Sequence, residues 1–199
     1  MVYSRTVGPL EGRDDMWKRH LVIAAAAITF SVPAAAGVTV IGSSSARMCY
    51  LAAEAGVLPT LEDLSRCDTA IAEVRDTRTH LVATHVNRGI VRMRRGDIPG
   101  ALRDFDQASA LNPNEPEAYF NRGSALLRSE QAGEAVTMFT QAIQLSTRRP
   151  AQAFYARGVA NEVLGNLRAA YADYQQASQL APDWQPPRRE LRRFRVSSR

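Results

Sequence analysis

Small and aromatic residues recur along this chain with a nearly constant period. Glycine occurs at positions 89, 123 and 158, which lie 34 and 35 residues apart. Five series with one period and one shared insertion near residues 148–150 indicate an internal structural repeat. The four other series are Ala101, Ala135 and Ala170; Phe105, Phe139 and Tyr174; Ala108, Ala142 and Ala177; and Leu111, Leu145 and Leu180.

Within one period the spacing is that of two helices joined by a tight turn. Ala101, Phe105 and Ala108 share one face of a helix, where the alanines leave room for a neighbour and the phenylalanine fills the core. The repeated glycine marks the point where the first helix approaches that face. The sequence therefore predicts an all-α fold of helical hairpins. Residues that end helices stand between the segments, namely Gly96, Pro113, Gly165 and Pro182.

This pattern resembles the tetratricopeptide repeat (TPR), a helical hairpin of about 34 residues with aromatic residues, Gly, Ala and Pro at fixed positions. Three units are expected within residues 80–184, at about 82–115, 116–150 and 151–184. Unit one has His85 where an aromatic residue is usual. Unit two has Ser129-Glu130-Gln131 in place of the turn glycine and Thr147 in place of proline. The resemblance implies a short right-handed solenoid whose middle joint these departures weaken.

The regions beside the repeats are expected to cap the solenoid. Residues 37–79 are predicted to hold a degenerate repeat with helices at 46–55 and 61–74, in which Cys67 and Ala70 fall where the aromatic residue and an alanine of the second helix would be. Residues 185–199 are predicted to form an Arg-rich cap and tail, with a polar helix over 187–196 that docks Leu191 and Phe194.

The N-terminal residues 1–36 contain the three parts of a secretory signal peptide. Lys18 and Arg19 form a basic start, residues 21–36 carry no charge, and Ala34-Ala35-Ala36 offers a small-residue cleavage site. Residues 1–15 are polar and unlike a signal start, so Met16 is a candidate for the true start of translation. The alternatives are an uncleaved inner-membrane anchor over residues 21–42, since about 20 apolar residues span a bilayer, and a buried soluble helix.

Cys49 and Cys67 are the only cysteines, and one lies on each helix of the predicted N-terminal cap. After export, an even cysteine count favours a disulfide. Because 17 residues lie between them, the bond would stabilise the fold by about 3 kcal/mol in the chain-entropy model. Two free buried thiols are the alternative.

The formal net charge of +5 is concentrated in the C-terminal tail. Residues 188–199 hold six arginines and one glutamate, whereas residues 37–187 hold 15 arginines and 16 acidic residues. A duplex-binding protein more often spreads basic residues over a folded face, so no nucleic-acid partner is expected. The tail, Arg188–Arg199, is expected to form a solvated cap, with weak contact to acidic lipid headgroups or cell-wall polymers as the alternative.

The TPR resemblance implies that the first helices line a concave groove that binds a peptide. Asparagine side chains there hold an extended backbone, arginines pair with acidic residues and apolar residues accept side chains. A solvated helix face without a ligand is the alternative. Carried over position by position, the groove residues are Asn87, Ile90, Arg94, Phe120, Asn121, Ser124, Arg128, Tyr155, Val159 and Glu162.

One use of the TPR groove is excluded by the residues present. Chaperone-binding members of the family grip a C-terminal carboxylate with Lys, Asn and Arg from successive first helices. Only Asn121 matches that clamp in this chain, because Val86, Ile90, Gln152 and Ala156 occupy the other positions.

An arginine precedes each repeated glycine, at positions 88, 122 and 157, where the family usually has leucine. These arginines form either a ligand-binding ladder or ion pairs within each repeat. Asp104 and Asp173 lie sixteen residues after the first and third arginine, whereas unit two has Met138. Ion pairing is therefore favoured, and exposed pairs of this kind contribute only about 0–1 kcal/mol.

No catalytic or cofactor-binding pattern is found in the sequence. It contains no H-E-x-x-H, no phosphate-binding P-loop and no nucleotide-binding glycine fingerprint, so neither an enzyme nor a cofactor or metal site is expected. The expected function is a scaffold or adaptor that binds a protein or peptide in the bacterial periplasm. The alternative is an envelope or membrane tether that uses an uncleaved N-terminal helix or the Arg-rich tail.

Overall fold

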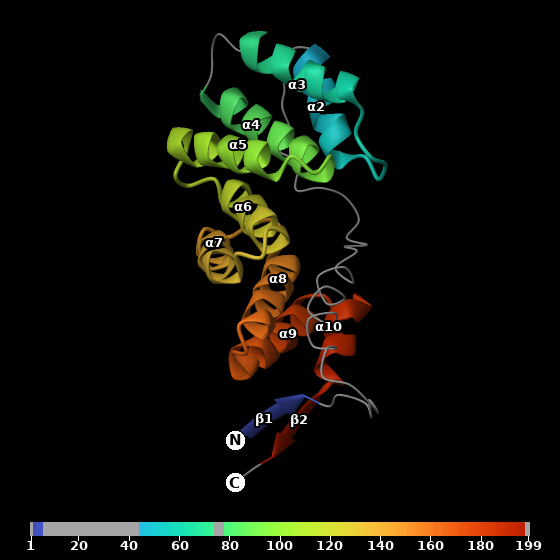
Figure 1. Ribbon diagram of the computed structural model, residues 1–199, viewed down its shortest axis with the longest axis vertical. Coiled ribbons are helices and arrows are strands. Elements are labelled where there is room, and N and C mark those ends of the chain that lie inside the picture. Colours follow the sequence, from blue (N-terminus) through green and yellow to red (C-terminus); the bar gives the residue numbers. More distant parts are fainter. Residues whose placement is uncertain (1, 6–43, 74–77, 198–199) are drawn as a thin grey trace, which may run out of the picture.

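The computed structural model describes residues 2–5, 44–73 and 78–197. Over this part the chain forms a row of helical hairpins that runs from α2 at one end to α10 at the other (Figure 1). The hairpins are α2 (Ser44–Glu54) with α3 (Leu61–Glu73), α4 (Arg78–Arg94) with α5 (Ile98–Leu111), α6 (Pro116–Arg128) with α7 (Ala132–Gln144), and α8 (Pro150–Val163) with α9 (Leu167–Leu180). They are followed by α10 (Gln185–Leu191), and β1 (Val2–Arg5) pairs antiparallel with β2 (Phe194–Ser197).

Each repeat hairpin closes where a glycine of its first helix meets an aromatic ring of its second helix. A Cβ atom placed on Gly123 would lie 2.9 Å from Cδ1 of Phe139, which is closer than real Cβ atoms approach another carbon. The ring of Phe139 is itself fully buried, so it has little room to move aside. The same conflict would occur in the pairs Gly89–Phe105 and Gly158–Tyr174.

The alanines of the second helices line the same contacts. All six alanines of the two alanine series are completely buried, as the sequence predicted. Their small methyl side chains let the two helices approach closely. These residues are Ala101, Ala108, Ala135, Ala142, Ala170 and Ala177.

The buried apolar residues fall into three clusters along the row of hairpins. The first cluster joins the α2–α3 hairpin to α4, α5 and the alanines Ala118 and Ala125 of α6. The second joins α6 and α7 to α8, and the third lies between α9 and the C-terminal segment around Phe194. Each cluster thus spans a junction between neighbouring elements, as expected when a repeat buries its faces against the next one.

The turn of unit two is preserved although it has no glycine. Gly96 and Gly165 adopt φ angles of +87° and +76° in the turns of units one and three. Glu130 takes the corresponding position in unit two with a φ of +64°. A non-glycine residue in this left-handed region costs roughly 1 kcal/mol, so the departure carries an energetic cost without changing the chain path.

Thr147, which replaces the repeat proline, forms a polar link between units two and three. Its hydroxyl donates a hydrogen bond to the buried carboxylate of Glu117 at 2.8 Å, and the backbone N–H of Arg148 donates to the same oxygen at 2.9 Å. A side-chain carboxylate at the start of α6 therefore fixes the chain where it enters α8.

The α2–α3 hairpin packs on α4 and caps the N-terminal end of the repeats. Its helices lie within two residues of the predicted bounds. In the structure Cys49 and Cys67 are joined by a disulfide, and both residues are fully buried beside Ala53 and Ala70. The bond crosses the hairpin at a place where the other hairpins have a glycine and an aromatic ring.

The predicted closing helix over residues 187–196 forms, but it ends earlier than expected. The helix is α10, which ends at Leu191, and Phe194–Ser197 form the strand β2 instead. Phe194 and Val196 alternate with polar residues, a pattern that favours an extended chain. Phe194 nevertheless docks inward as expected, with ring centroids 5.5 Å from Tyr171 and 6.0 Å from Tyr174.

Substitution of Gly89 by Ala is expected to destabilise the fold by about 1–3 kcal/mol, because the added methyl group overlaps the buried ring of Phe105. Urea unfolding followed by helix circular dichroism measures this change. Gly133 provides the matched control, since nothing lies within 4 Å of a Cβ atom built there. Gly133→Ala should stabilise the fold by about 0.5–1 kcal/mol. Equal stability of the two variants would contradict the close-contact interpretation.

Candidate peptide-binding face

The first helices of the three repeats, α4, α6 and α8, carry all the predicted groove residues, and we call the surface that they form the first-helix face. The structure divides the predicted residues by accessibility. The buried ones are Asn87, Ile90, Phe120 and Asn121. Those that remain at least partly accessible to a partner are Arg94, Ser124, Arg128, Tyr155, Val159 and Glu162.

The polar residues of α6 are partly used within their own helix. The Nδ2 group of Asn121 donates to the backbone carbonyl of Glu117 at 2.8 Å. The hydroxyl of Ser124 donates to the carbonyl of Phe120 at 3.0 Å. Asn121 is thus a packed residue whose amide donates inside the helix, whereas Ser124 is half-buried on the first-helix face.

Aromatic rings occupy the C-terminal end of the face. Tyr155 lies 5.6 Å from Tyr174 and 5.0 Å from Trp184, measured between ring centroids. Burial, together with the negative charge of Glu190, raises the pKa of the Tyr155 hydroxyl to about 12. Trp184 was not predicted from the sequence, because this residue caps α10 and has no periodic counterpart in the other units.

Two arginines of the face bind backbone carbonyl groups. The Nη1 group of Arg94 donates to the carbonyls of Ala52 and Ala53, at 3.2 and 3.3 Å, and its Nη2 group donates to the carbonyl of Val57. The Nη1 group of Arg128 reaches the carbonyl of Met93 at 3.4 Å. Burial lowers the pKa of both guanidinium groups, and the positive charge of Arg94 lowers that of Arg128 further.

A third arginine reaches the last turn of α2. Nη2 of Arg149, just before α8, lies 3.8 Å from Oε1 of Glu54. Burial lowers the pKa of Arg149, while the nearby carboxylates of Glu54 and Glu117 oppose that effect. The end of α2 therefore contacts both α4 and the start of α8. The sequence offered no signal for this contact, because it joins segments almost a hundred residues apart.

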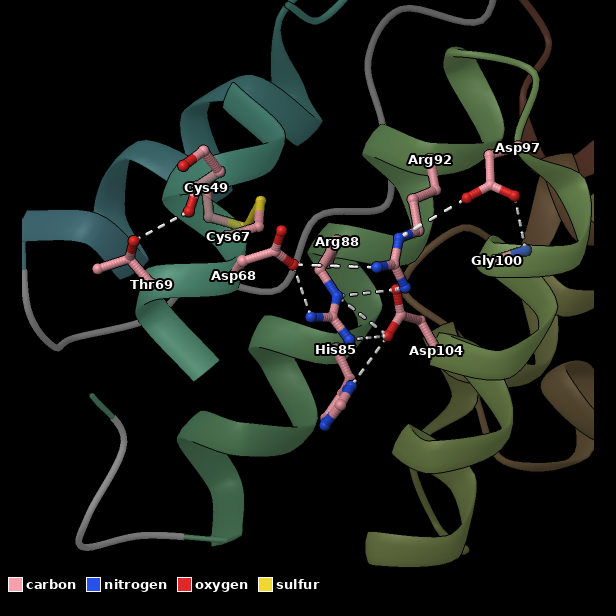
Figure 2. Close-up of polar contacts among 11 residues, drawn as sticks. Cys49, Cys67, Asp68, Thr69, His85, Arg88, Arg92, Asp97, Gly100 and Asp104 are labelled. Atoms are coloured by element: carbon pink, nitrogen blue, oxygen red, sulfur yellow. Dashed lines mark hydrogen bonds and ion pairs between the residues drawn. A yellow bond between two sulfur atoms is a disulfide. The ribbon is translucent and has the colours of Figure 1, made fainter. Parts of the chain in front are cut away.

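The N-terminal end of the face is held by a buried charge network (Figure 2). The side chain of Asp104 is 2% exposed, and its oxygens lie 2.6 Å from Nη2 of Arg88 and 2.7 Å from Nη1 of Arg92. Nδ1 of His85 lies 3.1 Å from the same carboxylate, and Nη1 of Arg88 also contacts Asp68 of α3 at 2.8 Å. These contacts join α3, α4 and α5, so they fix the N-terminal hairpin against unit one.

The sequence correctly paired Arg88 with Asp104 and Arg157 with Asp173, but it wrongly treated both pairs as exposed. Nη2 of Arg157 lies 2.7 Å from Oδ1 of Asp173, whose side chain is 7% exposed. Because both carboxylates are buried, removing either one would leave a partly buried arginine without its counter-charge, which costs more than breaking a surface pair. The ligand-ladder alternative loses support, because these arginines are engaged inside the protein.

Arg122 lacks an aspartate on the facing helix, as the sequence indicated, but it has another partner. Its Nε group lies 2.7 Å from Oδ1 of Asp106, which belongs to α5 of the preceding unit. Its Nη1 group contacts Sδ of Met138 at 3.0 Å. All three arginines thus reach the preceding hairpin, since Arg88 contacts Asp68 and Arg157 donates to Thr140. Arg88 and Arg157 also pair with an aspartate of their own hairpin.

Some predictions cannot be located in this structure. The predicted signal peptide over 1–36 lies outside the described residues except for Val2–Arg5, and the whole of the alternative anchor over 21–42 lies outside them too. Among the residues that are described, no helix is long and apolar enough to cross a membrane. The same residues include no group of His, Cys, Asp or Glu side chains that could hold a metal ion.

The repeat region of this chain is similar to known families and proteins. A family profile described as "TPR repeat" matches residues 89–130, and one described as "Tetratricopeptide repeat" matches residues 122–183. Serine/threonine-protein phosphatase 5 of Rattus norvegicus is 36% identical over 87 residues, which make up 44% of this chain and 17% of that protein. The chain thus spans only a small part of this relative.

Two solved structures are similar in fold and sequence. The first TPR of Spaghetti (RPAP3), bound to an HSP90 peptide SRMEEVD, has a TM-score of 0.54 and 25% identity, covering 56% of this chain and 87% of that one. The second TPR domain of the human RPAP3 protein, in complex with an HSP70 peptide SGPTIEEVD, has a TM-score of 0.55 and 26% identity, covering 58% and 96%.

Substitution of Asp104 by Asn is expected to destabilise the fold by about 3 kcal/mol at neutral pH, because Arg88 and Arg92 then lose a buried counter-charge. Burial alone would raise the pKa of Asp104, but hydrogen bonds from His85 and Arg88 and the charges of Arg88 and Arg92 hold it below the ordinary value. A carboxylate whose pKa is lower in the folded state contributes its full stabilisation of the fold at pH values above its unfolded-state pKa of about 4. That contribution is lost as the pH falls through the folded-state pKa.

Urea unfolding at a series of pH values tests this prediction. The free-energy difference between wild type and Asp104→Asn should be constant at neutral pH and shrink below about pH 4. The exposed Asp106 supplies a control, since Asp106→Asn should cost less than about 1 kcal/mol at every pH. A difference for Asp104→Asn that does not change with pH would show that the network does not depend on its charge.

Proposed function

Because this chain belongs to the tetratricopeptide-repeat family, we propose that it is an interaction scaffold that binds a segment of a partner protein on its first-helix face. The observation that carries the proposal is the row of accessible side chains on successive first helices, Arg94, Ser124, Arg128, Tyr155 and Val159. A row that continues from one hairpin to the next suits an extended chain better than a compact small molecule.

The similar structures support this choice of partner class. Two TPR domains of RPAP3 proteins are described in complex with chaperone peptides. This chain does not share the clamp residues, and three of the positions concerned hold the buried apolar residues Val86, Ile90 and Ala156. We therefore propose peptide binding of the same general kind with a different partner.

We also propose that the protein is exported to the bacterial periplasm. The basic start and uncharged run of residues 16–36 support this location. The disulfide between Cys49 and Cys67 supports it as well, because such bonds persist in oxidising compartments. Cell fractionation with N-terminal sequencing should place a chain that begins near Gly37 in the periplasmic fraction. Recovery of the intact chain with reduced thiols from the cytoplasm would refute the proposal.

Blocking the first-helix face should abolish partner binding. Ser124→Arg places a long charged side chain in the middle of the face, where it obstructs a bound segment without touching the ion-pair networks. Thr137 on α7 is the matched control, because its hydroxyl also donates to a carbonyl four residues earlier and its side chain is exposed.

Pull-downs from envelope extract compare wild type with the two variants. Proteins captured by wild type and Thr137→Arg, but lost with Ser124→Arg, are the expected result. If Ser124→Arg captures the same proteins as wild type, or if no protein is captured by any of them, the first-helix face is not the binding surface.

A further inference from the structure

Arg94 and Arg128 differ from the arginines of the ion-pair networks. Arg88, Arg92 and Arg157 each have a carboxylate at about hydrogen-bond distance. Within the part of the chain that the structure describes, the hydrogen bonds of Arg94 and Arg128 instead all end on backbone carbonyl oxygens. A carbonyl group carries no charge, so it does not neutralise a guanidinium group.

These two cations are also close enough to repel each other. Arg94 ends α4 and Arg128 ends α6, so they hold the same place in consecutive first helices. The charge of Arg94 lowers the pKa of Arg128, and burial lowers the pKa of both. Two neighbouring guanidinium groups that have no carboxylate partner among the described residues favour the binding of an anion.

The loop beside Arg94 presents apolar side chains to solvent. We call residues 55–61 the apolar loop, in which Val57 is 72% exposed and both Leu58 and Leu61 are 70% exposed. Arg94 holds the carbonyl of Val57, and Nη1 of Arg95 donates to the carbonyl of Pro59 at 2.7 Å. The loop is therefore fixed in place while its large side chains face outward, an arrangement typical of a contact surface.

We propose that Arg94 and Arg128 bind an acidic side chain of the partner segment, and that the apolar loop binds apolar residues next to it. This inference rests on the proposed function, because it specifies the chemistry of a segment bound on the first-helix face. The two arginines lie at positions other than those of the chaperone-peptide clamp, which in this chain are Val86, Ile90, Gln152 and Ala156.

The protein already shows the same chemistry at a neighbouring position. Arg149, another arginine whose pKa is lowered by burial, lies near the carboxylate of Glu54. Glu54 ends α2, only a few residues before the apolar loop. A carboxylate of the chain itself thus pairs with Arg149, and a carboxylate of the partner would pair with Arg94 and Arg128 in the same way. Planar guanidinium groups bind carboxylates through paired hydrogen bonds.

Selection from a random library of linear dodecapeptides displayed on phage tests the inference with the full chain and its disulfide intact. Bound peptides should be enriched in Asp or Glu next to apolar residues, relative to the unselected library. A synthetic peptide from this pool should bind the Arg94→Gln/Arg128→Gln variant at least about tenfold more weakly. The exposed Arg103 and Arg168, which lie on second helices, supply the control double variant.

The single variant Arg128→Glu tests the charge without unfolding the protein. The one hydrogen bond that Arg128 makes among the described residues, to the carbonyl of Met93 at 3.4 Å, contributes little to the fold. This charge reversal places a carboxylate beside Arg94, so the selected peptides should lose their preference for acidic residues. Leu58→Ser should remove the preference for the adjacent apolar residues while the acidic preference remains.

The possible failures are distinguishable. If no peptides are enriched on wild type, peptide binding itself fails, and the inference falls with the proposed function. Enrichment that Ser124→Arg abolishes, but that shows no acidic preference, overturns this inference and leaves the proposed function intact. An acidic preference that survives both Arg94→Gln/Arg128→Gln and Arg128→Glu also overturns it, because other residues would then supply the charge.

Discussion

The structure depends on one repeated contact, in which an aromatic ring lies directly on a glycine of the facing helix. This contact sets the distance between the two helices of every repeat hairpin. Because the distance is fixed, the alanines on either side of the ring fit, and the opposite side of each first helix is presented at a constant place. The regular spacing of accessible residues along the first-helix face is therefore a product of the core.

In the N-terminal hairpin, a disulfide holds α2 and α3 together, and ion pairs fix the hairpin to unit one. Its second helix has no large ring in the core, and a disulfide between Cys49 and Cys67 crosses the hairpin instead. The charge network around Asp104 then fixes this hairpin to unit one through Asp68 and Arg88. As a result the apolar loop is held beside Arg94 of unit one.

Periodic features were predictable from the sequence, and features without a periodic counterpart were not. The glycines, alanines and rings that repeat every 34 or 35 residues gave the hairpins correctly, and the fixed interval after Arg88 and Arg157 gave two ion pairs. The burial of Asp104 and Asn121 was not evident, because it depends on how hairpins stack. Trp184, the strand β2 and the contact between Glu54 and Arg149 arise from single, non-repeated segments, so comparison of the units could not find them.

The division of the core into three clusters affects how the molecule comes apart. A junction between clusters can open while the buried residues on either side stay packed, so the protein need not unfold in one step. Amide hydrogens near such a junction would exchange with solvent sooner than those inside a cluster. A partner segment that binds across two hairpins would stabilise the closed junction between them. Partner binding would therefore make the unfolding of the two hairpins more cooperative.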